Sequence, residues 1–205
     1  MASKTNSFTT LVFLLLTLIA GSAKALSPVI LVMGDSLSAA YGMPLEKGWV
    51  HLTQKRMQSR ARFVNASISA ETTAGAAHNL PGLLQKHRPQ IVILEIGAND
   101  GLRGHPPAAI FMNLAAMIER SLEAGSAVVL AGIDIPSNYG PAYREAFRSV
   151  YPKLAADYDI AFIASLFDEI YSRPDLLQDD RLHPNEKAQI LIADRIFESL
   201  NTLLD

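Results

Sequence analysis

A serine that directly follows a short apolar run is the first sign of chemistry in this sequence. Ser36 lies in Gly34-Asp35-Ser36-Leu37-Ser38, immediately after the apolar residues 29–33. Between a strand and a helix, a serine can present its hydroxyl as a nucleophile while its backbone N–H binds an anion. Serine and aspartate also cap ordinary helices. The segment alone leaves both interpretations open.

A candidate base for this serine stands near the other end of the chain. Histidine can take a proton from a hydroxyl near neutral pH, and it needs a partner that fixes its tautomer. Asp180 and His183 are three residues apart in Asp180-Arg181-Leu182-His183, close enough to pair in a turn. Asp179 is a neighbouring candidate, but the spacing favours Asp180. A helix-capping role is the alternative for His183.

Acyl transfer also requires hydrogen-bond donors for the developing oxyanion, often backbone N–H groups and an asparagine side chain. Asn99, in Ile96-Gly97-Ala98-Asn99-Asp100-Gly101, is the candidate side-chain donor. Asn-Asp-Gly is also strong turn chemistry. Alongside Ser36 and His183, the donor role is favoured.

Metal-assisted hydrolysis is a competing interpretation. Asp35, Asp100, Asp180 and His183 could supply oxygen and nitrogen ligands. The sequence has no His-x-x-x-His pair and no dense acidic loop, and a metal mechanism leaves Ser36 without a part. We therefore expect neither a metal nor a cofactor.

The elements that must position these residues alternate along the chain. Short runs rich in Ile, Val and Leu predict buried strands at 29–33, 62–65, 91–95, 127–131 and 160–163. Helical periodicity predicts helices at about 49–59, 74–86, 107–124, 140–158 and 184–203, with Pro184 suited to the first helical position. This alternation predicts an α/β fold, a flavodoxin-like three-layer sandwich around a five-stranded parallel sheet.

Each polar cluster follows a predicted strand. Ser36 follows the first strand, Ala70-Glu71-Thr72 the second, and Asn99-Asp100 the third, while Asp180 and His183 lie beyond the fifth. Ligands of open α/β sheets bind outside the carboxyl ends of the strands. We therefore expect these segments to meet at one edge of the sheet.

The first 25 residues differ from the rest. Lys4 precedes a nearly continuous apolar stretch at 8–20, and Ala23-Lys24-Ala25 has the small-x-small form of a cleavage site. The stretch is shorter than the roughly 20 residues that span a bilayer, which favours a cleaved signal peptide at 1–25 over an uncleaved anchor. Residues 26–205 would then form one periplasmic or secreted domain, a monomer without stable membrane insertion.

Composition limits the remaining classes of function. The chain of 205 residues is 49% hydrophobic, enough for a sizeable core. Its 19% charged residues mix both signs without a polybasic run, so a nucleic-acid partner is not expected. The absence of cysteine excludes a thiol nucleophile, a disulfide framework and a lipid-modified cysteine.

From about residue 29 to the last helix, the sequence resembles the SGNH branch of the GDSL hydrolases, in particular its bacterial periplasmic thioesterases, arylesterases and lysophospholipases. The resemblance rests on Gly34-Asp35-Ser36-Leu37-Ser38, on 97–104 and on 179–185, with further support at 65–69, 135–140 and 151–155. It implies Ser36 as nucleophile, His183 as base and Asp180 as the orienting acid. It also implies Asn99 and the Ser36 backbone N–H as oxyanion donors.

One position departs from the family pattern. Ala70 stands where the family places a glycine that serves as a backbone oxyanion donor. A backbone N–H donates whatever the side chain, but a methyl group restricts the conformation of that residue. We expect Ala70 to keep the donor role, and we expect Leu102, Ile135 and Tyr139 to contact the substrate.

These observations predict an esterase and thioesterase that acts on small-molecule acyl esters through an acyl-enzyme intermediate. A carbohydrate or cell-wall O-acetylesterase of the same fold is the alternative, although the only tryptophan, Trp49, lies in a predicted helix and does not suggest an exposed sugar platform. A non-catalytic binding module is a third possibility, and it treats the convergence of polar segments as coincidence.

Overall fold

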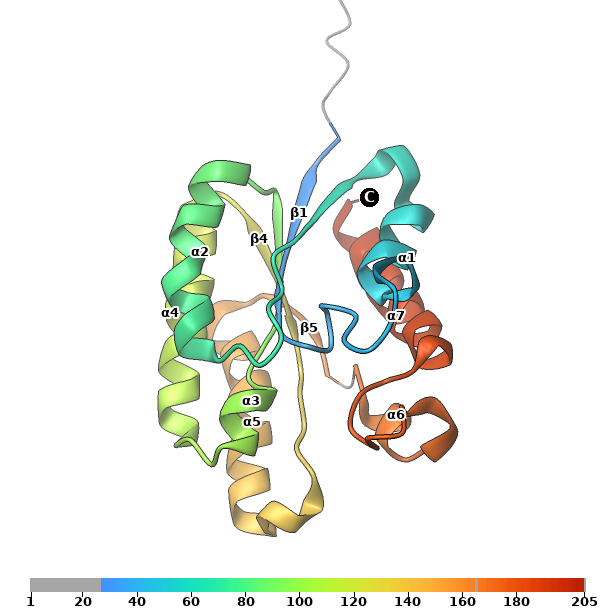
Figure 1. Ribbon diagram of the computed structural model, residues 1–205. Helices are drawn as coiled ribbons and strands as arrows, with labels where there is room; N and C mark the ends of the chain where they lie inside the picture. Colours follow the sequence, from blue (N-terminus) through green and yellow to red (C-terminus); the bar gives the residue numbers. More distant parts are fainter. Residues whose placement is uncertain (1–26, 165, 205) are drawn as a thin grey trace, which may run out of the picture.

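A five-stranded, all-parallel sheet forms the centre of the molecule (Figure 1). The computed structural model describes residues 27–164 and 166–204, so the predicted signal peptide lies outside the described residues. The strand order is β2-β1-β3-β4-β5, the flavodoxin-like order, which confirms the predicted fold. The strands are β1 (Val29–Gly34), β2 (Arg62–Asn65), β3 (Ile91–Glu95), β4 (Ala127–Ala131) and β5 (Ala161–Ile163).

Helices cover both faces of the sheet (Figure 1). One face carries α2 (Thr73–His87), α4 (Pro107–Glu123) and α5 (Pro141–Tyr158), and the other carries α1 (Trp49–Met57) and α7 (Glu186–Leu204). Two short helices, α3 (Ala98–Leu102) and α6 (Asp168–Tyr171), follow β3 and β5. The site loops begin where the strands end, at the edge opposite the start of β1.

The apolar patterns that predict the elements also form the core. Every residue of β3 is buried, as expected for a central strand covered on both faces. On α7, Ala188, Ile192, Ile196 and Leu200 recur every four residues and are fully buried against the sheet. Burial of these two sets fixes the register of the strand and the rotation of the helix.

Several predicted boundaries were wrong by a few residues. The first helix ends at Met57, and 58–60 form a 3₁₀ turn instead of continuing to 59. The last helix starts at Glu186, so Pro184 is not its first residue. Pro184 instead forms an antiparallel bridge with Leu177, which keeps the chain extended there. Asn185 caps the helix, because its side-chain oxygen accepts hydrogen bonds from the backbone N–H groups of the second and third helical residues.

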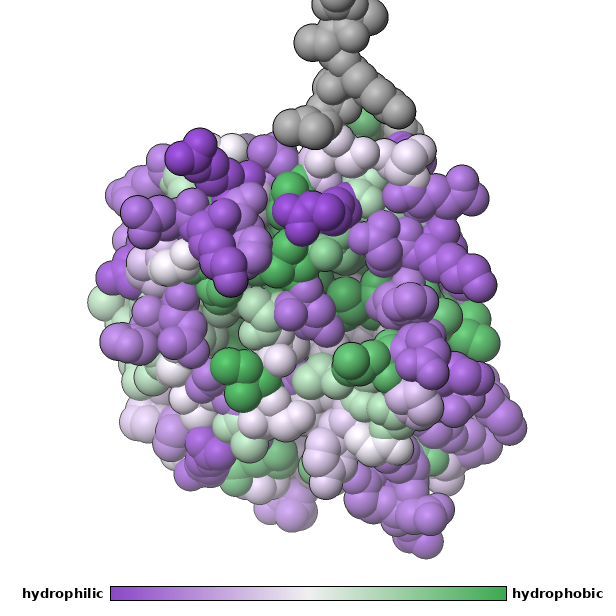
Figure 2. Space-filling model, turned by 45° about the horizontal axis from the view of Figure 1, so that its top comes forward, coloured by the Kyte–Doolittle hydropathy of each residue, from purple (hydrophilic) through white to green (hydrophobic). Residues whose placement is uncertain are grey.

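The surface around the start of β1 is mainly polar. Figure 2 shows hydrophilic side chains over most of this face, with small apolar patches scattered among them. Within residues 27–164 and 166–204, no helix is long and apolar enough to cross a membrane.

The Asn185 cap generates the first prediction. Its amide also donates to the carbonyls of Asp175 and Leu177, at 2.9 and 3.0 Å, so one side chain joins the loop to the helix. We expect Asn185→Ala to lower the free energy of unfolding by about 1–2 kcal/mol, measured by urea denaturation. Gln85→Ala, on the exposed surface of α2, is the control and should change it by less than about 0.5 kcal/mol. An equal effect of the two substitutions would contradict the capping role.

Candidate active site

The predicted convergence of polar segments is present at the carboxyl edge of the sheet. Ser36, Ala70, Asn99 and His183 line one cavity of about 240 Å³, here called the active-site cavity. They come from the loops after β1 and β2, from α3, and from the loop before α7. The topology therefore brings together side chains that are far apart in the sequence.

Ser36, His183 and Asp180 form a continuous chain of polar contacts. Ser36 Oγ lies 2.9 Å from His183 Nε2, and His183 Nδ1 lies 2.6 Å from Asp180 Oδ2. The other carboxylate oxygen of Asp180 accepts hydrogen bonds from the backbone N–H groups of Leu182 and His183, both at 2.9 Å. The turn itself thus holds the carboxylate against the imidazole.

The charge of Asp180 fixes the tautomer of the histidine. Desolvation alone would raise the pKa of Asp180. The hydrogen bonds from the backbone and ring of His183 and from the Leu182 backbone outweigh this effect, and they lower the pKa to about 2. An ionised carboxylate only accepts hydrogen bonds, so Nδ1 of His183 carries the proton. In a neutral ring, Nε2 is then an acceptor and faces the hydroxyl of Ser36. This is the orientation that a general base requires.

Asp35 organises the turn that carries Ser36. Its Oδ1 accepts from the Leu37 backbone N–H at 3.0 Å, and its Oδ2 accepts from the side-chain amide of Asn99 at 3.0 Å. Asp35 is fully buried. Burial raises the pKa of Asp35 to about 6. The hydrogen bonds from Leu37 and Asn99 and the electrostatic attraction of His183 oppose this rise. The amide of Asn99 has a second N–H hydrogen that this bond does not use.

A second buried acid, Glu95, was not anticipated from the sequence. It is fully buried at the end of β3, opposite Gly34, and accepts a hydrogen bond from Ser38 Oγ at 2.5 Å. Burial, together with the nearby charge of Asp35, raises its pKa well above the usual range. A charged residue type at the end of an otherwise apolar strand is the signal that could have revealed it.

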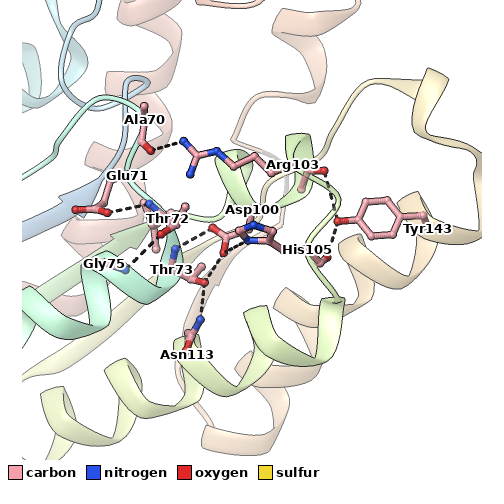
Figure 3. A network of polar contacts seen from close by, with 12 residues as sticks. Ala70, Glu71, Thr72, Thr73, Gly75, Asp100, Arg103, His105, Asn113 and Tyr143 are labelled. Carbon is pink, nitrogen blue, oxygen red and sulfur yellow. Dashed lines mark hydrogen bonds and ion pairs between the residues drawn. The ribbon is translucent and has the colours of Figure 1, made fainter.

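Ala70 adopts the conformation that the family glycine would adopt more easily. Its φ is +63°, in the left-handed region that residues with a Cβ atom rarely occupy. Its carbonyl accepts a hydrogen bond from Arg103 Nη2 at 3.1 Å, drawn in Figure 3. The methyl group is therefore accommodated on a strained backbone.

The other end of the Ala70 loop is held by a buried carboxylate. Asp100 accepts hydrogen bonds from the backbone N–H and the hydroxyl of Thr73, both at 2.8 Å, and its Oδ1 lies 3.3 Å from His105 Nδ1 (Figure 3). Asn113 donates to the same threonine hydroxyl. Because Asp100 follows Asn99 directly, this network fixes the Ala70 loop relative to the Asn99 side chain.

Two further residues at the site were missed by the sequence analysis. The ring of Tyr41 lies against His183, with ring centroids 4.4 Å apart. The side-chain amide of Gln178 donates to the carbonyls of Tyr41 and Pro184, at 2.8 and 3.1 Å, and so joins the Ser36 loop to the His183 loop. Contacts between loops this distant in the sequence leave no local signal.

The predicted substrate-contacting residues are placed in three different ways. Leu102 lines the active-site cavity and also a neighbouring cavity of about 530 Å³, here called the side cavity. Ile135 lines the side cavity. Tyr139 lines neither of these two cavities, but its hydroxyl donates to the carbonyl of Leu102 at 2.8 Å and so contacts a residue that lines both.

The residues considered as metal ligands have other contacts. Asp35 bonds to Leu37 and Asn99, Asp100 to Thr73, and Asp180 to His183, as described above. In the described part of the chain, no group of three or more His, Asp or Glu side chains is arranged to hold a metal ion.

Comparison with known proteins supports the family resemblance. Residues 32–189 match the model of the GDSL-like Lipase/Acylhydrolase family. The chain is 40% identical to the Thioesterase 1/protease 1/lysophospholipase L1 of Escherichia coli, over 94% of this chain and 92% of the relative. It is also 40% identical to the Esterase TesA of Pseudomonas aeruginosa, over 92% and 96%.

A solved structure agrees in fold as well. The psychrotrophic esterase EstA of a Pseudoalteromonas species superposes with a TM-score of 0.83 at 42% identity, covering 87% of this chain and 99% of the esterase. The family model covers most of this chain, and the relatives match it nearly end to end. The chain therefore belongs to the GDSL-like lipase/acylhydrolase family.

Proposed function

We propose that the protein is a serine hydrolase that cleaves acyl esters and thioesters of small molecules. In this proposal Ser36 is the nucleophile, His183 the general base, and Asp180 the acid that orients it. The backbone N–H groups of Ser36 and Ala70 and the amide of Asn99 stabilise the oxyanion. The observation that carries the proposal is the contact chain from Ser36 through His183 to Asp180, with 2.9 and 2.6 Å links.

The geometry supports the following sequence of steps. Nε2 of His183 takes the hydroxyl proton as Ser36 Oγ attacks the acyl carbonyl carbon, and the carbonyl oxygen becomes an oxyanion between the proposed donors. The imidazolium then gives its proton to the departing alcohol or thiol, which leaves an acyl-Ser36 ester. Water, activated by the same nitrogen, releases the acid and restores the serine.

The names of the relatives support the choice of substrates. The Escherichia coli relative is named as a thioesterase and a lysophospholipase, and the Pseudomonas aeruginosa relative as an esterase. The structure of the Pseudoalteromonas esterase is described as inhibited by monoethylphosphonate. Because the chain belongs to a family of hydrolases and its relatives are named as esterases and thioesterases, we no longer consider a non-catalytic binding module.

The carbohydrate O-acetylesterase gains no support from the described structure. Trp49 is fully buried, so it offers no aromatic surface to a sugar ring. The side cavity, which adjoins the active-site cavity, has charged residues in its lining, but the part of its wall formed by Leu102, Ile135 and Leu182 is apolar. An apolar wall of this kind suits an acyl or alkyl chain better than a glycan.

Export of the protein is part of the proposal. Residues 1–25 would be a cleaved signal peptide and residues 26–205 the mature domain, active in the periplasm or outside the cell as a monomer. Sequencing the N-terminus of the protein recovered from a periplasmic fraction tests this assignment, and a start before residue 26 would contradict it.

Replacement of the nucleophile gives the central prediction. Ser36→Ala should lower kcat on p-nitrophenyl butyrate by about 10³-fold or more, because no other group can form the acyl ester. It should also abolish labelling by a fluorophosphonate probe, detected by mass spectrometry. Ser149→Ala, on the exposed face of α5, is the matched control and should retain both properties. Labelling of the Ser36→Ala protein would overturn the assignment.

The adjacent carboxylates Asp179 and Asp180 allow a sharp test of the orienting acid. Asp180→Asn removes the acceptor that fixes the His183 tautomer, so kcat should fall by about 10²–10⁴-fold. Asp179→Asn removes the same charge one residue away, from an exposed side chain, and should change kcat by less than about threefold. Steady-state kinetics at constant ionic strength measure both values. Equal losses would indicate a general charge effect instead of the specific contact.

The strained backbone at Ala70 leads to a prediction about stability and rate together. Ala70→Gly relieves the positive φ, so it should raise the free energy of unfolding by about 0.5–1 kcal/mol and alter kcat/KM by less than tenfold. Ala146→Gly, at an exposed position inside α5, should instead lower the free energy of unfolding by about 1 kcal/mol. Urea denaturation and ester kinetics on both variants give the comparison. A loss of more than a hundredfold in Ala70→Gly would show that the loop backbone is organised differently.

A further inference from the structure

The side cavity adjoins the active-site cavity. Four residues line both of them: Ala98, Leu102, Tyr171 and Leu182. A substrate group attached to the carbon that Ser36 attacks, or to its leaving oxygen or sulfur, can therefore extend into the side cavity. At about 530 Å³, this cavity is large enough to hold a substantial part of a small ligand.

The chemistry of the side cavity changes with distance from Ser36. The shared wall is largely apolar. Asp134 and Arg148 line the side cavity and also a third, smaller cavity. This third cavity shares no lining residue with the active-site cavity. They therefore lie at the end of the side cavity that is remote from the nucleophile. Largely apolar side chains thus lie between the nucleophile and the charges of Asp134 and Arg148, whereas Arg181 lines the side cavity nearer the proposed base.

Positive charge dominates that lining. The Asp134 carboxylate, only 9% exposed, accepts hydrogen bonds from Arg144 and lies 3.7 Å from Arg148 Nε. A third guanidinium, that of Arg181, also lines the side cavity. The lining of the side cavity thus contains one carboxylate and three guanidinium groups. A guanidinium has five N–H donors, so the contact at Nε leaves most of the donors of Arg148 for a ligand.

The backbone at Arg181 is strained. Its φ is +55°, in the left-handed region that favours glycine. The turn is held there by the Arg181 N–H, which donates to Gln178 O at 2.9 Å, and by the bonds to Asp180 described above. These bonds set the direction in which the chain presents Arg181, next to Asp180 and at the wall of the side cavity.

We propose that the side cavity is a subsite for an anionic group, a carboxylate or a phosphate, which an apolar spacer joins to the scissile ester. Arg148 and Arg181 bind the anion, because guanidinium groups match the oxygens of carboxylates and phosphates. Asp134 holds Arg144 and Arg148 in place and offsets only part of their charge. This inference rests on the proposed attack of Ser36 on esters.

Two matched pairs of substrates test the subsite and identify the side of the ester that it receives. The acyl pair is the p-nitrophenyl monoester of suberic acid and its neutral ω-methyl ester. The alcohol pair is the octanoate ester of hydroxyhexyl phosphate and the same ester with a dimethyl phosphate. The measured quantity is the ratio of kcat/KM, anionic over neutral, within each pair. The wild-type ratio should reach about fivefold or more in at least one pair, and it should fall as salt rises from about 0.02 to 0.5 M.

Two variants assign the effect to the named residues. In the substrate pair that shows the anionic preference, Arg148→Gln should bring the ratio of kcat/KM, anionic over neutral, down to about one. Arg181→Gly should lower the same ratio at least twofold. Glycine suits the backbone at residue 181, so that variant should also melt no lower than the wild type. Arg62→Gln is the matched control, since it removes one positive charge at the start of β2, the opposite edge of the sheet, and should leave the ratio unchanged.

Three outcomes would overturn the subsite: no anionic preference in either pair, a preference that survives both Arg148→Gln and Arg181→Gly, or an equal fall in Arg62→Gln. Failure of the proposed function would be seen separately, as hydrolysis of the neutral esters by the Ser36→Ala protein. The two results are independent, because every ratio is normalised to the neutral ester.

Discussion

The geometry of the site depends on the two hydrogen bonds that the buried carboxylate of Asp35 accepts. One fixes the turn that presents Ser36, and the other orients the amide of Asn99. Burial of this charge opposes folding, as the rise of its pKa to about 6 indicates. Burial and the nearby charge of Asp35 also raise the pKa of Glu95 well above its usual range, so two acids share the buried region beneath the Ser36 turn.

Much of this site could be predicted from the sequence, because parallel strands deliver their following loops to one edge. That rule, applied to apolar runs, is enough to bring Ser36, Ala70, Asn99 and His183 together. The helix boundaries were less predictable. At Pro184 a tertiary contact, the bridge with Leu177, overrides the usual preference of proline for the first turn. Glu95, Tyr41 and Gln178 act through contacts across the fold, which no local pattern encodes.

Two of the three proposed oxyanion donors, the Asn99 amide and the Ala70 N–H, belong to segments that one hydrogen-bond network joins. Asp100 and Arg103, which follow Asn99 on and after α3, bond to the two ends of the Ala70 loop (Figure 3). The spacing between the Asn99 amide and the Ala70 N–H is therefore set by protein contacts before any substrate arrives. Preorganisation of this kind lets donors stabilise a developing charge without rearrangement. It also explains how the site tolerates an alanine with positive φ.

The contact between Ser36 and His183 joins residues that are 147 positions apart. Ser36 follows the first strand, whereas His183 precedes the last helix, so a chain that is still being made holds its nucleophile without its base. A folding intermediate with a complete sheet but an undocked α7 would be in the same condition. Hydrolytic activity thus requires the loop before α7 to be docked against the loop after β1. A chain without that contact carries a serine with no base beside it, and such a hydroxyl is a weak nucleophile.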